Sequence, residues 1–155
     1  MTFLFKVITR FHVFLYRLTS GRVGGKLGKA PVLLLTTTGR KSGKAFTTPL
    51  LYLLDEHSMV VIASYGGSDK HPAWYLNLTR EPRCVVQVRG TKIAVEAETV
   101  ASEAREALWK RVVDMYPGYA SYQKKTARVI PLVRLTPRGT VPVQEVILKG
   151  AVELD

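Results

Sequence analysis

The chain has 155 residues, with 23 Lys and Arg, 12 Asp and Glu, three His and one Cys, for a net charge of +11. This length fits one domain that folds without a metal or disulfide, and a single cysteine excludes an internal disulfide framework. The histidines at 12, 57 and 71 are too far apart for a zinc motif such as HExxH, and without a run of 18 apolar residues no membrane-spanning helix is expected.

The positive charge is concentrated in the N-terminal third of the chain. Residues 1–54 hold nine Lys and Arg and no acid, whereas the remaining 101 residues hold 14 basic and 12 acidic ones, beginning with Asp55. A basic region of this kind favours an anionic partner, which could be lipid, nucleic acid or a small molecule.

Residues 1–18 are interpreted as an amphipathic basic segment, with a helix predicted over 3–18. Lys6, Arg10 and Arg17 fall in one narrow stripe of a helix that is otherwise mostly apolar. This pattern is typical of a helix at a membrane surface. It fits equally a helix docked on its own domain, and the two arrangements are compatible. The same three charges break the apolar core that a signal peptide needs.

After a Gly-rich linker or loop at 19–31, the pattern predicts a β domain over 32–137. Residues 84–89 and 92–98 alternate apolar and polar side chains, as strands with one buried face do. Further strands are expected at 32–38, 46–54, 59–64 and 131–136, and helices at 72–80, at 103–115 with Ser102 as N-cap, and at 117–128. Short strands joined by hairpins favour a mainly β fold with flanking helices, an antiparallel barrel.

Three segments carry residues suited to binding or chemistry. A strand ending in three threonines leads into Gly39, Arg40, Lys41, Ser42, Gly43 and Lys44, a set of donors that suits a phosphate or carboxylate but also occurs in solvated hairpins. Residues 63–78 pass from a strand through a Gly-Gly turn into a helix start, with His71 interpreted as a helix cap. Tyr116, Tyr119 and Tyr122 could wall a substrate or simply pack in the core.

Together these segments resemble the deazaflavin-dependent nitroreductase family. The matching stretches are LLLTTTGRKSGKAFTTPL, VVIASYGGSDKHPAWYLNLTREP and MYPGYASYQKKTARVIPLVRLTP, which occur in order over about residues 17–137. The family is related to split β-barrel flavin-binding proteins, so the resemblance implies a split antiparallel barrel of the flavin-reductase or FMN-binding type. It also implies coenzyme F420, whose reduced form donates a hydride.

The resemblance implies roles for individual residues. The anionic part of the coenzyme is expected at the loop of Arg40, Lys41 and Ser42, and Tyr116, Tyr119 and Tyr122 are expected at the catalytic, substrate side. The full set of expected coenzyme-binding residues is Arg40, Lys41, Ser42, Lys44, Thr48, Pro49, Ala63, Ser64, Gly66, Gly67, Ala73, Trp74, Tyr75 and Asn77. Many relatives carry Lys where this chain has Tyr65. No metal is expected, and residues 138–155 form an extension without an assigned role.

The implied activity is hydride transfer from reduced F420 to an electron-poor acceptor, namely a quinone, an activated ene or a nitroaromatic. Two alternatives stay open: an FMN-binding split-barrel protein, and a basic lipid- or nucleic-acid-binding protein without catalysis. For the reductase, we expect a small-molecule acceptor, no nucleic acid, and a cytoplasmic location with peripheral contact at an anionic membrane. The sequence gives no signal for the oligomeric state.

Overall fold

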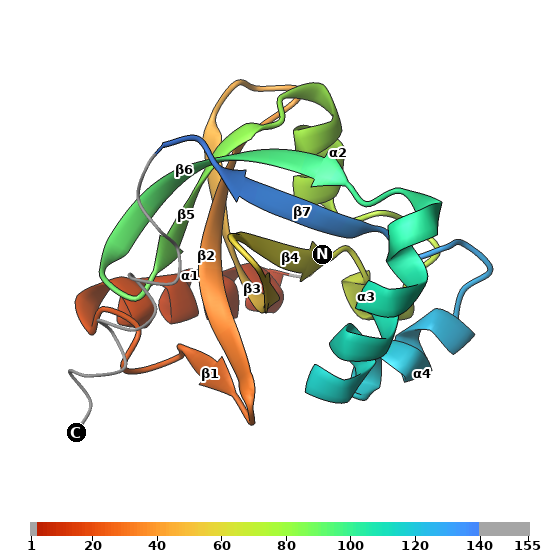
Figure 1. The fold of residues 1–155 in the computed structure, drawn as a ribbon. Helices are drawn as coiled ribbons and strands as arrows, with labels where there is room; N and C mark the ends of the chain where they lie inside the picture. Colours follow the sequence, from red (N-terminus) through yellow and green to blue (C-terminus); the bar gives the residue numbers. More distant parts are fainter. Residues whose placement is uncertain (1–2, 140–155) are drawn as a thin grey trace.

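The structure, a computed structural model, describes residues 3–139, so residues 1–2 and nearly all of the predicted extension 138–155 lie outside the described part. The elements are α1 (Phe3–Leu18), β1 (Lys26–Leu27), β2 (Ala30–Thr38), β3 (Ala45–Asp55), β4 (Ser58–Ile62), the 3-10 turn η1 (Tyr65–Gly67), α2 (Ala73–Arg80), β5 (Arg83–Val88), β6 (Thr91–Thr99), α3 (Ser102–Met115), α4 (Gly118–Lys124) and β7 (Leu132–Pro137) (Figure 1). Each predicted strand and helix is confirmed with bounds shifted by at most a residue or two, except the last helix, which ends earlier than predicted.

The larger strands form a closed antiparallel barrel. The sheet order is β1-β2-β3-β4-β7-β6-β5, and an additional pairing of β2 with β5 closes the sheet on itself. The long strand β3 pairs with two strands in turn: its residues 45–51 pair with β2, and its residues 52–55 pair with β4. The short strand β1 lies outside this closed circuit and pairs only with β2 in the described part of the chain. The predicted mainly β fold is therefore confirmed.

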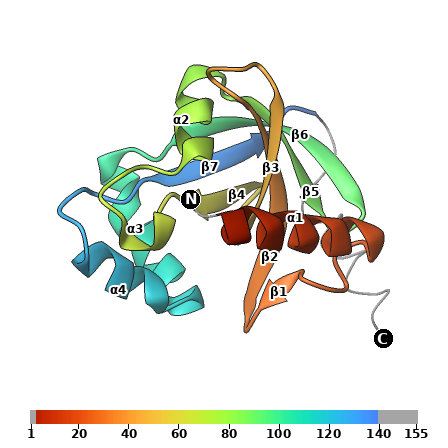
Figure 2. The same ribbon diagram turned by 180° about the vertical axis from the view of Figure 1, so that it is seen from behind.

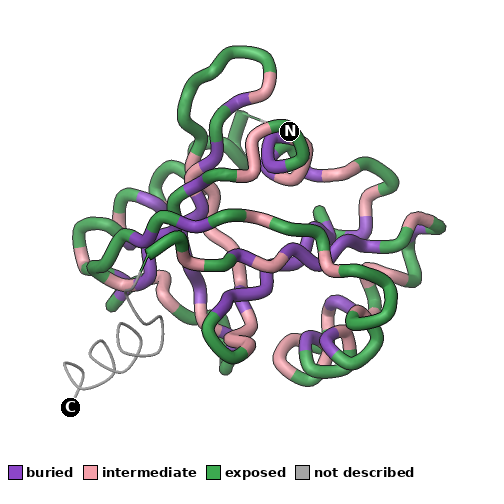
Figure 3. Tube along the Cα trace, turned by 45° about the horizontal axis from the view of Figure 1, so that its top comes forward, coloured by how far each residue is buried: buried purple, intermediate pink, exposed green. Residues whose placement is uncertain are grey.

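Alternating apolar residues of the strands fill the barrel. Cys84, Val86 and Val88 of β5 are buried, as their spacing predicts, and Ile93 and Val95 of β6 face the same core. Figure 3 shows that buried stretches follow the strands through the middle of the molecule, while much of the periphery is exposed. The interior of the barrel is therefore packed with side chains.

The helices α2, α3 and α4 flank the barrel. Trp74 and Leu78 of α2 enter the barrel core. Leu108 and Val112 of α3 join Tyr119 of α4 in a second core against the outer face of β4 and β7. Figure 1 shows α3 and α4 together on one side of the barrel.

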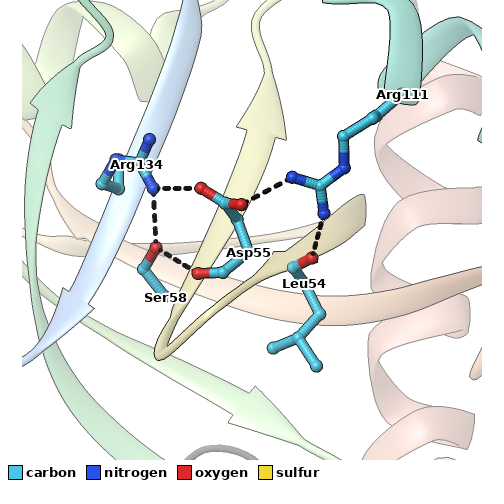
Figure 4. Close-up of polar contacts among 5 residues, drawn as sticks. All are labelled: Leu54, Asp55, Ser58, Arg111 and Arg134. Atoms are coloured by element: carbon cyan, nitrogen blue, oxygen red, sulfur yellow. Dashed lines mark hydrogen bonds and ion pairs between the residues drawn. The ribbon is translucent and has the colours of Figure 1, made fainter. Parts of the chain in front are cut away.

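One ion-pair cluster ties α3 to the β3–β4 hairpin (Figure 4). The Asp55 carboxylate accepts a hydrogen bond from Arg111 of α3 at 2.6 Å and another from Arg134 of β7 at 2.5 Å. Arg111 also donates to the Leu54 carbonyl, and Arg134 donates to the Ser58 hydroxyl. The hydrogen bonds from Arg134 and then Arg111 hold the pKa of Asp55 below its ordinary value.

The prediction of Ser102 as an N-cap is wrong. Ser102 is already the first residue of α3, and Ala101, with φ −64° and ψ 153°, occupies the cap position without a side-chain hydrogen bond. The backbone amides of Ala104 and Arg105 instead bond to the Ala101 carbonyl. A serine inside the first turn has helical backbone angles, so it cannot take the extended cap geometry.

The helix α1 is docked on the outside of the barrel, on the face opposite β7 (Figure 2). The hydroxyl of Tyr16, a fully buried residue, donates to the Val32 carbonyl at 3.0 Å and accepts from the Arg89 backbone amide at 2.7 Å. Val13 packs beside Tyr16 against Val32 and Leu34 of β2. Two buried side chains and these hydrogen bonds therefore anchor α1.

The Gly-rich segment 19–31 follows an ordered path from α1 into the barrel. The Gly24 carbonyl lies 2.9 Å from Nε2 of His12. Gly24 has φ +78°, a left-handed backbone angle that favours glycine, and it packs against the His12 ring. The segment then forms β1, which pairs with the start of β2.

Most apolar side chains of α1 nevertheless face solvent. Seven exposed apolar residues share one side of the helix, and each is 45% to 84% exposed. We call them the α1 apolar stripe: Phe3, Leu4, Val7, Ile8, Phe11, Phe14 and Leu18. The exposed basic residues Lys6, Arg10 and Arg17 border this stripe along one side of the helix.

Within residues 3–139, no helix is both long enough and apolar enough to cross a membrane.

Candidate functional site

The loop between β2 and β3 is a tight, donor-rich turn. The Gly39 backbone amide bonds to the Lys44 carbonyl at 2.7 Å, and the Gly43 amide bonds to the Gly39 carbonyl at 2.8 Å. Lys41, Ser42 and Lys44 are exposed around this turn. Among the ion pairs found within residues 3–139, none involves a cation of this loop, so its positive charges are available to an anionic ligand.

Asn77 of α2 fixes this loop. Its side-chain oxygen accepts from the backbone amide and from the guanidinium of Arg40, and its amide nitrogen donates to the Thr37 hydroxyl at 3.1 Å. Asn77 is only 4% exposed. The structure therefore places Asn77 as the support of Arg40, a role that its position in the sequence did not reveal.

Thr48 and Pro49 lie on β3, next to the base of the same loop. Both are partly exposed, and they pair with Leu35 and Leu34 of β2. One step along the strand, the hydroxyls of Thr36 and Thr47 hydrogen bond at 2.8 Å. This stretch of β3 thus continues the polar surface that the loop begins.

The second predicted segment makes a left-handed turn after β4. Tyr65, Gly66 and Gly67 have φ of +46°, +64° and +84° in succession. Ala63 and Ser64 before the turn are buried, and Tyr65, at the position where many relatives carry Lys, is 39% exposed. Left-handed angles suit glycine and cost a tyrosine about 1 kcal/mol, so the conformation must be held by its surroundings.

This turn lies directly against the tyrosine helix α4. A Cβ on Gly67 would lie 2.7 Å from the Tyr122 carbonyl oxygen and 3.0 Å from the Lys125 Cβ. Only glycine permits so close an approach. Two segments that are more than fifty residues apart in the chain are thereby brought together.

The three predicted tyrosines form one cluster. Ring centroids are 5.2 Å apart for Tyr116 and Tyr119, 6.0 Å for Tyr119 and Tyr122, and 6.5 Å for Tyr116 and Tyr122. Tyr119 is buried, and this burial raises its pKa. The pKa of the partly exposed Tyr122 is raised first by a hydrogen bond with Tyr116 and then by burial. The cluster therefore presents Tyr116 and Tyr122 toward solvent more than Tyr119.

The remaining predicted residues of α2 have different surroundings. Trp74 is 7% exposed and packs in the barrel core, whereas Ala73 is exposed. Tyr75 is partly exposed and its hydroxyl lies 3.0 Å from the Thr99 hydroxyl. Ala73 and Tyr75 are therefore more accessible to a ligand than Trp74.

The prediction of His71 as a helix cap is wrong. Pro72 is the N-cap of α2, and no side chain caps the helix. Nδ1 of His71 instead lies 3.3 Å from the Arg128 guanidinium. Burial and then the charge of Arg128 lower the pKa of His71. Sequence reasoning missed Arg128, because no local pattern links it to a segment about sixty residues earlier.

Both loops, α2 and the tyrosine cluster lie within the part of the chain that resembles a known family. The profile of the F420H(2)-dependent quinone reductase family matches residues 8–137. The chain belongs to this family. An F420H(2)-dependent quinone reductase of Mycobacterium tuberculosis is 37% identical over 135 residues, which cover 84% of this chain and 91% of that protein.

Solved structures agree with membership of the F420H(2)-dependent quinone reductase family. A structure described as an F420-H2 dependent reductase is 40% identical, with a TM-score of 0.63 over 68% of this chain and 93% of its own. Another, described as a domain-swapped dimer, is 37% identical, with a TM-score of 0.65 over 81% of this chain and 95% of its own. The resemblance to deazaflavin-dependent reductases and the split-barrel fold are thereby confirmed.

The residues present fit the coenzyme of this family. F420 carries a phosphodiester and a glutamate tail, and the β2–β3 loop offers Arg40, Lys41, Ser42 and Lys44 without a carboxylate among them. Planar guanidinium and compact ammonium groups both bind such anions. The donors of this loop therefore match the charge of the coenzyme.

Proposed function

We propose that this protein is an F420H(2)-dependent reductase that delivers a hydride to a quinone. Family membership supports the cofactor. The close approach of Gly67 to Tyr122 carries the proposal, because it brings together the turn that we assign to the coenzyme and the tyrosines that we assign to the acceptor. When bound, reduced F420 supplies the hydride, so the chain need not provide a nucleophile or a metal.

The work of the protein is then to bind and to orient. Arg40, Lys41, Ser42 and Lys44 hold the anionic part of the coenzyme, while Ser64 and the Gly66–Gly67 turn let the backbone approach its ring. Tyr116 and Tyr122 hydrogen bond to the acceptor oxygen and provide a proton as the acceptor is reduced. A phenolic hydroxyl can donate as well as accept a hydrogen bond, which suits this role.

A binding and turnover experiment tests this proposal. The full chain is titrated with F420, with flavin mononucleotide and with duplex DNA, and reduced F420 is then mixed with a quinone, an activated ene and a nitroaromatic. We expect selective binding of F420 and the fastest turnover with the quinone. Binding of flavin mononucleotide in preference to F420, or no turnover with any acceptor, would overturn it.

We further propose that the protein is cytoplasmic and binds the inner face of the cell membrane through α1. The α1 apolar stripe is exposed, and Lys6 and Arg10 border it, so the helix combines apolar insertion with attraction to anionic headgroups. Figures 1 and 2 place the N-terminal end of α1 toward the side of the barrel that carries α3 and α4. Membrane contact would thus occur on the side where a lipid-soluble acceptor meets the tyrosines.

Vesicle sedimentation tests this second proposal. A Phe11→Asp, Phe14→Asp variant should lose binding to anionic vesicles, and Lys6→Glu, Arg10→Glu should lose the part that salt screens. Leu27→Asp is the matched control, because Leu27 is an apolar side chain that is 53% exposed on β1, outside α1. If all variants sediment with vesicles as the wild type does, the proposal that α1 binds the membrane is wrong.

A further inference from the structure

The Arg128 side chain makes polar contacts along the whole of one loop, residues 63–71. Its Nε donates to the Ser68 carbonyl at 2.8 Å, and one terminal nitrogen donates to the carbonyls of Ala63 and Ser64 at 3.2 and 2.8 Å. The other terminal nitrogen lies 3.3 Å from Nδ1 of His71. All four partners belong to residues 63–71, so the planar fork spans that whole segment.

The segment that Arg128 holds is conformationally demanding. Its three successive left-handed residues, 65–67, are closed by only two short-range bonds, from the Gly67 amide to the Ser64 carbonyl and from the Ser68 amide to the Tyr65 carbonyl. The carbonyls of Ala63 and Ser68 point to Arg128 instead. Arg128 thus satisfies backbone acceptors where the chain leaves β4.

Other residues fix Arg128 and reinforce its contact. The Gln123 side chain donates to the Arg128 carbonyl at 2.7 Å and accepts from the Ile130 amide at 3.0 Å, which holds the chain after α4 in a set turn. The hydroxyl of Thr126, a buried residue, donates to Asp69 at 2.8 Å. The end of α4 and residues 63–71 are therefore joined by two neighbouring side chains, Thr126 and Arg128.

We infer that Arg128 is a positioning residue that locks residues 63–71 to α4, and so fixes the coenzyme-side turn relative to Tyr116 and Tyr122. This inference rests on the proposed function for its effect on F420 affinity, but not for the lock itself. The lock needs a guanidinium, because a lysine ammonium offers one nitrogen and cannot reach four groups spread along a loop.

Hydrogen–deuterium exchange of the full chain without coenzyme measures the lock directly. In the wild type, the amides of Gly67 and Ser68 should exchange far more slowly than the amide of the exposed residue Lys41 in the β2–β3 loop. In Arg128→Gln and Arg128→Lys, exchange at Gly67 and Ser68 should rise about tenfold or more, because the turn opens locally without global unfolding. Arg111→Lys is the control, since it breaks the Asp55 cluster away from this turn.

Coenzyme titration and kinetics measure the consequence. Both Arg128 variants should bind F420 roughly tenfold to a hundredfold more weakly. Guanidinium ion, added far below denaturing concentration, should partly restore affinity to Arg128→Ala but not to Lys41→Ala. Arg111→Lys should lower the melting temperature yet leave both the exchange of the turn and the affinity for F420 unchanged.

The outcomes separate the two proposals. If the wild type does not bind F420, the proposed function fails, while exchange at Gly67 and Ser68 still reports on the lock. The lock is overturned if folded Arg128 variants keep wild-type exchange and affinity. It is also overturned, without any variant, if Gly67 and Ser68 of the wild type exchange as fast as the exposed Lys41 amide.

Discussion

The side-chain oxygen of Asn77 accepts hydrogen bonds from both the backbone amide and the guanidinium of Arg40, at 3.1 and 3.2 Å. The side-chain nitrogen of Asn77 donates to the Thr37 hydroxyl. Asn77 thus hydrogen bonds to the end of β2 through its nitrogen and to the following loop through its oxygen. A buried amide that is satisfied in this way specifies one geometry for the cationic loop. Arg40 is therefore pre-oriented before any ligand arrives.

Removing this support should weaken both the fold and coenzyme binding. Asn77→Ala leaves the Arg40 amide and the Thr37 hydroxyl without their partner, which should cost about 1–3 kcal/mol of stability by chemical denaturation. Affinity for F420 should also fall, because Arg40 is no longer held. Thr79→Ala, an exposed change on the same helix, is the control. Unchanged F420 affinity in a folded Asn77→Ala variant would show that the Asn77 side chain does not contribute to coenzyme binding.

The β2–β3 loop should contribute affinity rather than turnover. Because a hydrogen bond to a charged group is worth about 1.5–3 kcal/mol, Lys41→Ala should weaken F420 binding roughly 10- to 150-fold. The rate at saturating F420 should change much less, since the chemistry occurs at the ring. Fluorescence titration at two ionic strengths checks this, and salt should weaken the wild type more than the variant. A folded Arg40→Ala, Lys41→Ala variant with wild-type affinity would contradict it.

The tyrosine hydroxyls should differ in their importance. Tyr116→Phe and Tyr122→Phe should lower turnover with a quinone roughly tenfold to a hundredfold, because they remove proton donors from the accessible part of the cluster. Tyr119→Phe should have the smallest effect, since Tyr119 is 6% exposed within an apolar core. Affinity for F420 should stay near the wild-type value in all three. Full activity of all three variants would deny the hydroxyls a catalytic role.

Asp55 should make the fold sensitive to acid. Its pKa is lowered in the folded protein by Arg134 and then Arg111, so its ionised form stabilises the fold above the ordinary carboxyl pKa. That stabilisation is lost as the pH falls through the lowered value. Asp55→Asn should cost about 1–3 kcal/mol at neutral pH and should flatten the loss of stability below about pH 4.

Thermal melts across this pH range check the role of Asp55. Glu81→Gln is the control, because Glu81 pairs with Arg83 in an exposed salt bridge, and such a pair contributes little. Its melting profile should follow the wild type. A profile for Asp55→Asn that runs parallel to the wild type at every pH would show that the cluster does not govern acid stability.

The sequence predicted best those features that depend on neighbouring residues. Period-two alternation identified β5 and β6 as strands with one buried face, and Cys84, Val86, Ile93 and Val95 are indeed buried. The cap predictions at Ser102 and His71 failed, because each rested on residue type alone. Helix starts depend on backbone angles that composition does not fix.

Polar contacts between residues far apart in the chain could not be predicted from the sequence. Asp55 and Arg111 are 56 residues apart, and Arg128 meets partners up to 65 residues earlier in the chain. Neither Arg128 nor Gln123 lies in a repeating pattern. Only the barrel's topology brings these side chains to their partners, so family resemblance could point to the segments of the site but not to the residues that hold them in place.

The anchoring of α1 by Tyr16 has a mechanical consequence. A membrane-bound helix joined to the barrel only by a flexible linker would let the barrel reorient freely. In this protein, the Tyr16 hydroxyl of α1 hydrogen bonds to the backbone of Val32 and Arg89 in the barrel. If α1 lies in the bilayer surface, the whole domain must adopt one tilt relative to the membrane. The proposed acceptor-side tyrosines would then keep a fixed orientation to the lipid, and Tyr16→Phe should loosen that orientation without detaching α1 from the membrane.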